Sequence, residues 1–285
     1  MNVRDVVAID VHTHVTKPTP RESTLGSSAV VDGLVRTGRG VTVDEIAAYY
    51  RERRMMAVVF PVDAETATGR RPVPNDDVVA GALRHPDVLI PFASVDPWKG
   101  RIALDEVDRL IADGHVYGFK FHPSTQAFYP DDRRFYPIYE RIAAAGLRIV
   151  FHSGQTAIGA RTPGGGGIKL KYSNPMHIDE VAADFHELRI LLAHPSVPWQ
   201  DEALAIAGHK ANVYLDLSGW SPKYFPPQLV QQANTLLREK VLFGSDFPML
   251  APDRWFEDFA AAGFRESVRP LLIKDNAVRF LGLEA

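Results

Sequence analysis

Short apolar segments alternate with amphipathic segments along almost the whole chain. Eight of the apolar segments are rich in Val, Ile, Leu and Phe and have the length of buried strands. Each is followed by a segment with the periodicity of an amphipathic helix, and one further helix closes the chain. Strands are therefore expected at residues 6–14, 56–62, 88–95, 116–122, 147–152, 188–194, 212–217 and 240–246.

The helices are expected at residues 42–54, 75–84, 101–112, 137–145, 178–185, 201–208, 227–237, 254–262 and 268–280. Thr42 and Asn75 have the side chains of N-caps for the first two. Eight strand–helix units predict an α/β fold, a (β/α)8 TIM barrel that forms a single domain over residues 1–285. An open doubly wound sheet is the alternative, but no glycine-rich dinucleotide fingerprint follows the first strand.

A long segment rich in Pro, Ser, Thr and Gly, residues 15–40, separates the first strand from the first helix. Loops of this length in compact domains usually serve as lids or binding loops, and a flexible surface excursion is the alternative.

Polar residues gather where five of the predicted strands end. In a (β/α)8 barrel the active site forms at these carboxyl ends, so the side chains are expected to converge. Side chains alternate along a strand, so His12 and His14 share one face, with Asp10 one layer deeper. The strand-end residues are His12, His14, Lys120, His122, His152, His194 and Asp246.

The other histidines differ in position. His177 follows the fifth strand, where it could contact substrate or cap a helix. Four more precede strands, at the opposite end of a barrel, and are expected to be structural or solvated: His85, His115, His186 and His209.

Composition narrows the chemistry. The chain has no cysteine, so any metal must be held by His, Asp, Glu or modified Lys. A net charge of −3 provides no basic surface for nucleic acid. The N-terminal apolar segment resembles neither a signal peptide nor a membrane span, and no later one approaches the required length of about 18 residues. A cytoplasmic protein without a membrane partner is the expectation.

The strand-end motifs together resemble the amidohydrolase superfamily. They are Asp10-x-His12-x-His14, His152, His194 and Gly-Ser-Asp246-x-Pro, and within the superfamily they are similar to the amidohydrolase-2 group of TIM-barrel, metal-dependent hydrolases and decarboxylases. Three longer stretches are similar to a subgroup that includes hydrolases of 4-hydroxyphenyl-β-ketoacyl-CoA thioesters. These stretches are Gly-Phe-Lys120-Phe-His122-Pro, the glycine run at 163–167, and the segment from Asp216 to Pro226.

The resemblance implies that one divalent ion is bound by His12, His14, His152 and Asp246. Zinc is the expected ion and manganese the alternative, since a site of nitrogen and oxygen ligands accepts several metals. His194 is implied as the acid/base, and Asp246 as the residue that orients or deprotonates the attacking water. Relatives of this kind form homodimers or homotetramers, whereas the residues themselves leave the oligomeric state open.

Lys120 has two interpretations. In binuclear amidohydrolases a fourth-strand lysine is carbamylated and bridges two metals, with both strand-end histidines as ligands. We favour one metal and an unmodified, cationic Lys120 that stabilises an oxyanion or a carboxylate.

The substrate is expected to be a small molecule, aromatic or carboxylated. Candidate contacts are His122, Arg161, Trp220, Lys223 and Tyr224, because these strand-end and loop residues offer aromatic rings and cations. The resemblance implies a metal-dependent hydrolase that uses a metal-activated water to attack an activated carbonyl, such as that of an aryl β-ketoacyl-CoA thioester, although the motifs themselves do not choose between hydrolysis and decarboxylation. A metal-dependent, non-oxidative decarboxylase of a hydroxylated aromatic or unsaturated acid is the alternative, and an inert ligand-binding barrel is a third.

Overall fold

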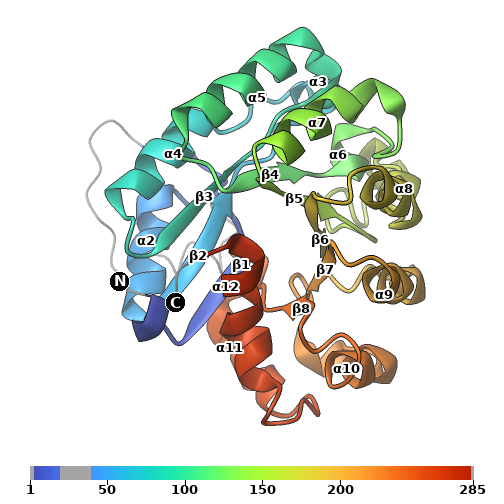
Figure 1. Cartoon of the computed structure of the whole chain (residues 1–285). Coiled ribbons are helices and arrows are strands. Elements are labelled where there is room, and N and C mark those ends of the chain that lie inside the picture. Colours follow the sequence, from blue (N-terminus) through green and yellow to red (C-terminus); the bar gives the residue numbers. More distant parts are fainter. Residues whose placement is uncertain (1–2, 20–39, 284–285) are drawn as a thin grey trace. The chain divides into compact units, whose positions relative to one another are not determined.

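The structure is a computed structural model that describes residues 3–19 and 40–283. Eight parallel strands follow one another in the order β1 to β8, which is the topology of the predicted (β/α)8 barrel (Figure 1). Each strand lies within or next to its predicted segment: β1 (Ala8–His14), β2 (Met55–Phe60), β3 (Leu89–Ala93), β4 (Gly118–Phe121), β5 (Arg148–His152), β6 (Arg189–Ala193), β7 (Val213–Asp216) and β8 (Val241–Leu242). The predicted fold class is confirmed, and the description of the whole chain as one domain stays a prediction.

The chain divides into two compact units. The first unit comprises residues 1–61, 73–93 and 216–285, and the second comprises residues 62–72 and 94–215. The predicted lid or binding loop falls largely on residues 20–39, which lie outside the described residues.

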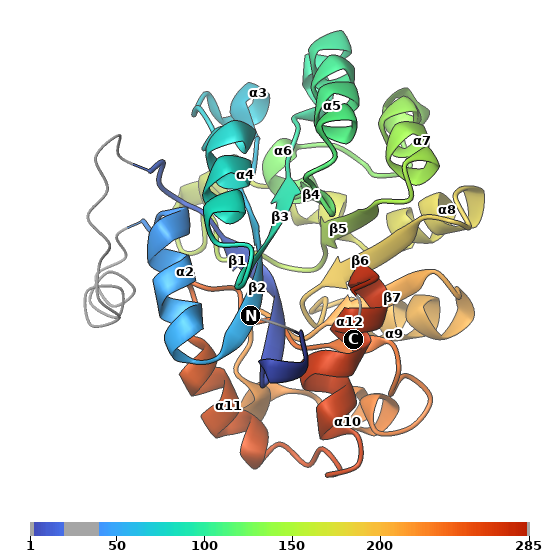
Figure 2. The same ribbon diagram turned by 60° about the vertical axis from the view of Figure 1, so that its left-hand side comes forward.

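In the first unit, β1 pairs with β2 and β2 with β3, and helices cover these strands. Helices α2 (Val43–Glu52) and α4 (Asn75–Arg84) lie side by side against β2 and β3 (Figures 1 and 2). All side chains of β2 and β3 are apolar and buried, which is typical of a parallel sheet under helices. The remaining helices are α10 (Pro227–Ala233), α11 (Pro252–Ala260) and α12 (Asn276–Leu281).

The two predicted N-caps have different outcomes. Thr42 forms a capping box with Glu45, in which each side chain accepts a hydrogen bond from the other residue's backbone N–H. Asn75 is wrong as a cap, because the helix begins there and Pro74 takes the cap position in an extended conformation. A proline cap offers no side-chain acceptor, so the polar Asn75 was the misleading signal.

In the second unit, β4 pairs with β5, β5 with β6 and β6 with β7. Its core is aromatic: Phe121, Tyr139 and Phe151 contact one another with ring centroids 5.5 to 6.0 Å apart. The covering helices are α5 (Arg101–Asp113), α7 (Tyr136–Ala144), α8 (Met176–Asp184) and α9 (Gln200–His209).

The largest differences from the predicted helices lie near the C-terminus. Helix α10 ends at Ala233, four residues earlier than expected, and the closing helix is a π-helical turn (Leu271–Asp275) followed by α12. Two short helices, α3 (Glu65–Thr68) and α6 (Pro123–Gln126), were not predicted. Among the described residues, no helix is both long and apolar enough to span a membrane.

Candidate active site

Three of the predicted metal ligands meet at the ends of β1 and β8 in the first unit. His14 Nε2 lies 3.0 Å from Asp246 Oδ1, His12 Nε2 lies 3.4 Å from the same oxygen, and the two Nε2 atoms are 3.2 Å apart. Strand alternation places both imidazoles on one face, as the sequence predicted. Phe60 packs edge-on against both rings and so forms an apolar wall beside the three donor atoms.

These donor distances fit a metal ion. Zinc–nitrogen and zinc–oxygen bonds are about 2.0 to 2.2 Å long, so donors that share an ion lie about 3.0 to 3.4 Å apart in octahedral or tetrahedral geometry. The three measured separations, 3.0, 3.2 and 3.4 Å, fall in that interval. Two imidazole nitrogens and one carboxylate oxygen also form a donor set that Zn²⁺ and Mn²⁺ accept.

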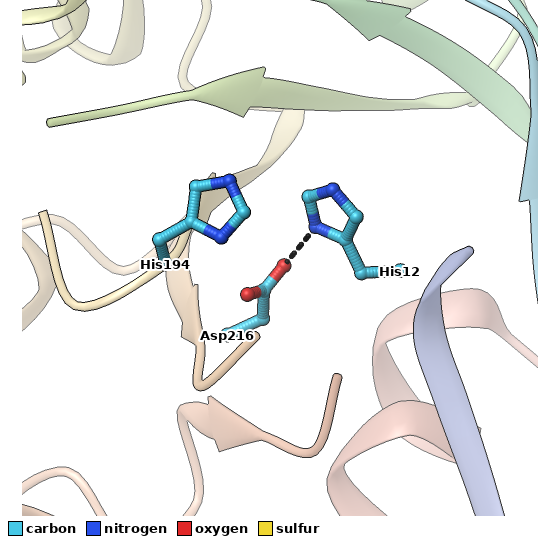
Figure 3. Close-up of side chains that lie close together, drawn as sticks. All are labelled: His12, His194 and Asp216. Carbon is cyan, nitrogen blue, oxygen red and sulfur yellow. Dashed lines mark hydrogen bonds and ion pairs between the residues drawn. The ribbon is translucent and has the colours of Figure 1, made fainter. Parts of the chain in front are cut away.

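The His12 ring is held from its other side. His12 Nδ1 lies 2.9 Å from Asp216 Oδ2, at the end of β7 (Figure 3). It also lies 3.0 Å from Ser218 Oγ. The Ser218 backbone N–H and hydroxyl both donate to Asp216 Oδ1. With three donors directed at it, the Asp216 carboxylate is an acceptor, and His12 Nδ1 carries the proton that it shares.

Asp10 lies deeper in β1 and joins the strand ends. Its carboxyl accepts hydrogen bonds from Tyr50 Oη at 2.6 Å and from the backbone N–H groups of His12 and Ser245, both at 3.0 Å. Burial raises the pKa of Asp10 to about 7, and these hydrogen bonds oppose that rise. Asp10 thus links the backbone of β1 to the segment that carries Asp246, in agreement with its predicted supporting place.

The second unit brings three predicted histidines together at the ends of β4, β5 and β6. His152 Nδ1 lies 3.0 Å from His194 Nε2, and the ring of His122 stacks on that of His152 with centroids 3.8 Å apart. The backbone N–H of Thr125 donates to His122 Nδ1, which leaves the proton of a neutral His122 ring on Nε2. One of the two nitrogens in the His152–His194 pair must carry a hydrogen, so this contact can pass a proton.

Hydrogen bonds between serine side chains and the backbone join the ends of β5 and β6. Ser153 Oγ donates to the Ala193 carbonyl at 2.9 Å and lies 2.6 Å from Ser196 Oγ. His194 itself has a φ of +73°, in the left-handed region that non-glycine residues rarely adopt. Such strain persists only where the surroundings impose it, and it concentrates at functional sites.

Lys120 and His122 leave β4 together. Lys120 is fully buried, and its carbonyl accepts a hydrogen bond from Ser94 Oγ at 2.8 Å. Gln126 accepts a hydrogen bond from the His122 backbone N–H, and its amide donates to the carbonyl oxygens of Asp63 and Val95. These bonds hold the end of β4 against neighbouring segments. The role of Lys120, modified or cationic, stays a prediction.

The predicted substrate contacts on loops differ in exposure. Arg161 is exposed in the loop after β5. At the start of α8, which follows that loop, His177 Nδ1 lies 2.8 Å from Asp131 Oδ2 and its ring packs against Tyr129, so the structure pairs it with the loop after β4.

In the first unit, Trp220 is half-buried and Tyr224 is 64% exposed. Lys223 Nζ lies 4.0 Å from Asp258 and 4.9 Å from the centroid of the Tyr224 ring. Lys223 also lines a surface pocket of about 530 Å³ together with Pro222, Phe225, Glu257, Asp258, Ala261, Ala262 and Gly263. The substrate-binding roles of these residues stay predictions.

Sequence reasoning missed Asp216 and Ser218 as site residues. It used the segment from Asp216 to Pro226 for the family resemblance and for its aromatic and cationic side chains, without giving Asp216 or Ser218 a role. The available signal was positional, because Asp216 is a carboxylate at a strand end, like Asp246.

Comparison with known proteins decides the family. A family model described as amidohydrolase matches residues 9–283. The chain belongs to the amidohydrolase family. It is accordingly an enzyme of the amidohydrolase superfamily, as its motifs implied. A search of curated protein sequences finds no match.

Solved structures similar to this amidohydrolase share its fold. An uncharacterized TIM-barrel protein, Bb4693 of Bordetella bronchiseptica, is 23% identical, with 96% of this chain and 98% of that one covered and a TM-score of 0.74. A dihydroxybenzoic acid decarboxylase of Polaromonas sp. JS666, with bound manganese and 2-nitroresorcinol, is 19% identical over 100% and 98% of the chains, with a TM-score of 0.67. A probable 2-pyrone-4,6-dicarboxylic acid hydrolase of Acinetobacter baumannii, with citric acid bound, is 15% identical over 97% and 99%, with a TM-score of 0.62.

Proposed function

We propose that this amidohydrolase is a metal-dependent hydrolase that adds water to an activated carbonyl of a small, carboxylated or aromatic substrate. The observation that carries the proposal is the set of three donor atoms at 3.0 to 3.4 Å on His12, His14 and Asp246. A divalent ion held there would lower the pKa of a coordinated water and polarise a substrate carbonyl. His152 is kept as the fourth proposed ligand, and Zn²⁺ and Mn²⁺ are both candidates.

The chain's own residues supply the remaining chemistry in this proposal. The Asp246 oxygen that does not face the two imidazoles accepts the proton of the attacking water, because Oδ1 is one of the three donor atoms proposed to hold the metal. His194 delivers a proton to the leaving group, and its contact with His152 holds its Nε2 in a defined direction. Lys120 stabilises the negative charge that develops on the carbonyl oxygen.

Charge in the loop after β5 supports a carboxylated or otherwise anionic substrate. Residues 153–177 include Arg161, Lys169 and Lys171 and contain no Asp or Glu. A cationic loop that starts at the candidate ligand His152 attracts anions to that strand end. An aryl β-ketoacyl-CoA thioester, which carries phosphates, meets this requirement and is our specific candidate.

Decarboxylation of a hydroxylated aromatic acid is the second candidate. It is favoured by the similar fold of a decarboxylase with bound manganese and of a 2,6-dihydroxybenzoate decarboxylase from Rhizobium, 14% identical with a TM-score of 0.70. The two reactions share a metal and a proton donor, but hydrolysis consumes a water, whereas decarboxylation places a proton on carbon and releases CO₂.

The test uses the full chain, stripped of metal and reloaded separately with Zn²⁺ or Mn²⁺. Each preparation is incubated in H₂¹⁸O with two panels of candidate substrates. The first panel contains aryl β-keto thioesters and lactones, and the second contains hydroxybenzoates. One ¹⁸O per product carboxylate, lost in the metal-free protein and in His194→Gln, is the expected result. Release of CO₂ from a hydroxybenzoate without ¹⁸O uptake would replace the hydrolase by the decarboxylase. Turnover that metal removal leaves unchanged would contradict both.

A further inference from the structure

We infer that Asp216, with Ser218, is a positioning residue that fixes the His12 ring so that its Nε2 is presented to a divalent cation. This inference deepens the proposed function and rests on it. Asp216 Oδ2 contacts His12 at Nδ1, the ring nitrogen opposite the one that faces His14 and Asp246. Its effect passes through the His12 ring, from Nδ1 on one side to Nε2 on the other.

With the Asp216 carboxyl ionised, the hydrogen bonds allow one arrangement of protons. Asp216 Oδ1 accepts from the Ser218 backbone N–H and hydroxyl, so the single hydroxyl hydrogen of Ser218 is already used. His12 Nδ1 lies 2.9 Å from Asp216 Oδ2, which can only accept. Nδ1 therefore donates, and Nε2 of the neutral ring holds its lone pair toward His14 and Asp246.

Burial makes this arrangement rigid. The side chains of His12 and Asp216 have no exposed surface, and Ser218 is also fully buried. Because the site is buried, water does not readily replace a lost hydrogen-bonding partner there. Charge-assisted hydrogen bonds to a carboxylate are also about twice as strong as neutral ones. Rotation of the His12 ring away from this carboxylate would leave a buried acceptor unsatisfied.

Packing around the pair points the same way. A Cβ atom placed on Gly244, next to β8, would lie 3.0 Å from Ser218 Cβ, 3.1 Å from His12 Cβ and 3.4 Å from Asp216 Cγ. The backbone of the segment that leads to Asp246 therefore closes over all three side chains. A larger residue at Gly244 would press on the His12–Asp216 contact without removing any hydrogen-bonding group.

The experiment measures metal affinity of the metal-stripped full chain by titration with Zn²⁺ and Mn²⁺ against a competing chelator. Asp216→Ala is expected to weaken binding about 10- to 100-fold, the usual effect of removing a carboxylate that orients a ligand histidine. Asp216→Asn and Ser218→Ala are expected to lose less, since each keeps one hydrogen-bonding partner. Asp258→Asn is the matched control, because Asp258 lies in the same unit and also accepts a hydrogen bond from a serine, Ser221. The metal affinity of this variant should equal that of the wild-type protein.

A second readout separates positioning from a merely structural role. Long-range ¹H–¹⁵N spectra of the metal-free protein should show His12 protonated at Nδ1, and this signature should be lost in Asp216→Ala while the unfolding transition stays cooperative. If Asp216→Ala fails to fold, Asp216→Asn and Ser218→Ala decide by the same two readouts.

The outcomes distinguish the inference from the proposed function. The inference alone would be overturned if the wild-type protein binds metal and all three variants bind it with an affinity within about twofold of wild type. Such a change is far smaller than the expected loss of affinity. The three variants are Asp216→Ala, Asp216→Asn and Ser218→Ala. A wild-type protein that binds neither Zn²⁺ nor Mn²⁺ would overturn the proposed function and the inference together.

Discussion

The strand ends of the two units carry different kinds of contact. In the first unit the two imidazoles of the candidate site contact each other, and each also meets a carboxylate: His12 contacts Asp216, and His14 contacts Asp246. In the second unit the contacts join imidazole to imidazole, through the stacked rings of His122 and His152 and the hydrogen bond between His152 and His194. Carboxylates therefore accompany the histidines of the first unit, whereas those of the second unit form a histidine cluster.

This difference indicates which unit is suited to metal binding and which to proton transfer. A divalent cation is stabilised by carboxylates that offset its charge, and histidine ligands are oriented by such partners. Imidazoles that contact one another can exchange a proton near neutral pH, since each nitrogen can donate or accept. We therefore expect metal binding to depend on the first unit most strongly and proton transfer on the second.

Asp246→Asn should have the largest effect, because it removes the anionic donor that both Nε2 atoms face. Metal content should fall to background, and kcat/KM on any substrate that the proposed test identifies should fall by at least about 10³-fold, the scale of losing the main electrostatic stabilisation. Metal analysis and steady-state kinetics check this. Asp253→Asn, a carboxylate of the same unit in a half-exposed ion pair with Arg53, is the control and should keep both metal and activity.

His194→Gln should lower kcat by about 10²- to 10⁴-fold, the contribution of one general acid or base, while metal content stays at the wild-type level. Kinetics and metal analysis on the same preparation separate the two effects. A His194→Gln protein that loses its metal as completely as Asp246→Asn would abolish the division of tasks between the two units.

Much of this comparison follows from local rules. Alternation along a strand places His12 and His14 on one face wherever the strand lies, and the Thr42-x-x-Glu45 spacing is enough to form a capping box. Strand positions were also predictable, because the apolar segments are short and bounded by polar residues, but the last strand, β8 (Val241–Leu242), is much shorter than the predicted 240–246.

What escaped prediction depends on tertiary contacts. The partner of His12 lies 204 positions further along the chain, and nothing in the sequence around Asp216 marks it as that partner. The stacking of His122 on His152 and the left-handed backbone of His194 likewise arise from the packing of neighbouring strand ends. Local patterns carry no information about such pairings.

Two glycines test how tightly each unit's strand ends are packed. At Gly154, where φ is +85°, an added Cβ would lie 2.6 Å from the backbone of Ser196, whereas at Gly244 the nearest atom is a side-chain carbon at 3.0 Å. Gly154→Ala should lower the free energy of unfolding by more than about 2 kcal/mol, from the left-handed backbone and the clash combined. Gly244→Ala should cost clearly less, because its neighbours can shift.

Denaturant unfolding of the two glycine variants beside wild type measures this difference. Equal losses would show that the end of β5 is no more rigid than the segment after β8. We attribute the left-handed backbone of His194 to tight packing between the ends of β5 and β6, and equal losses would remove that reason.

The smallest expected effect compares the loss of one side-chain hydroxyl from each unit. Tyr50→Phe removes the 2.6 Å bond to the Asp10 carboxyl and a 3.3 Å contact with Ser245 Oγ, and Ser153→Ala removes neutral bonds to the Ala193 carbonyl and to Ser196 Oγ. Burial raises the pKa of Asp10 to about 7, so its carboxyl is fully charged only well above that pH. Hydrogen bonds to a charged group contribute about 1.5 to 3 kcal/mol and neutral ones about 0.5 to 1.5, so in urea unfolding well above the pKa of Asp10, Tyr50→Phe should destabilise the protein more. The reverse order would mean that the carboxyl-centred network of the first unit stabilises its strand ends no better than the serine contacts of the second.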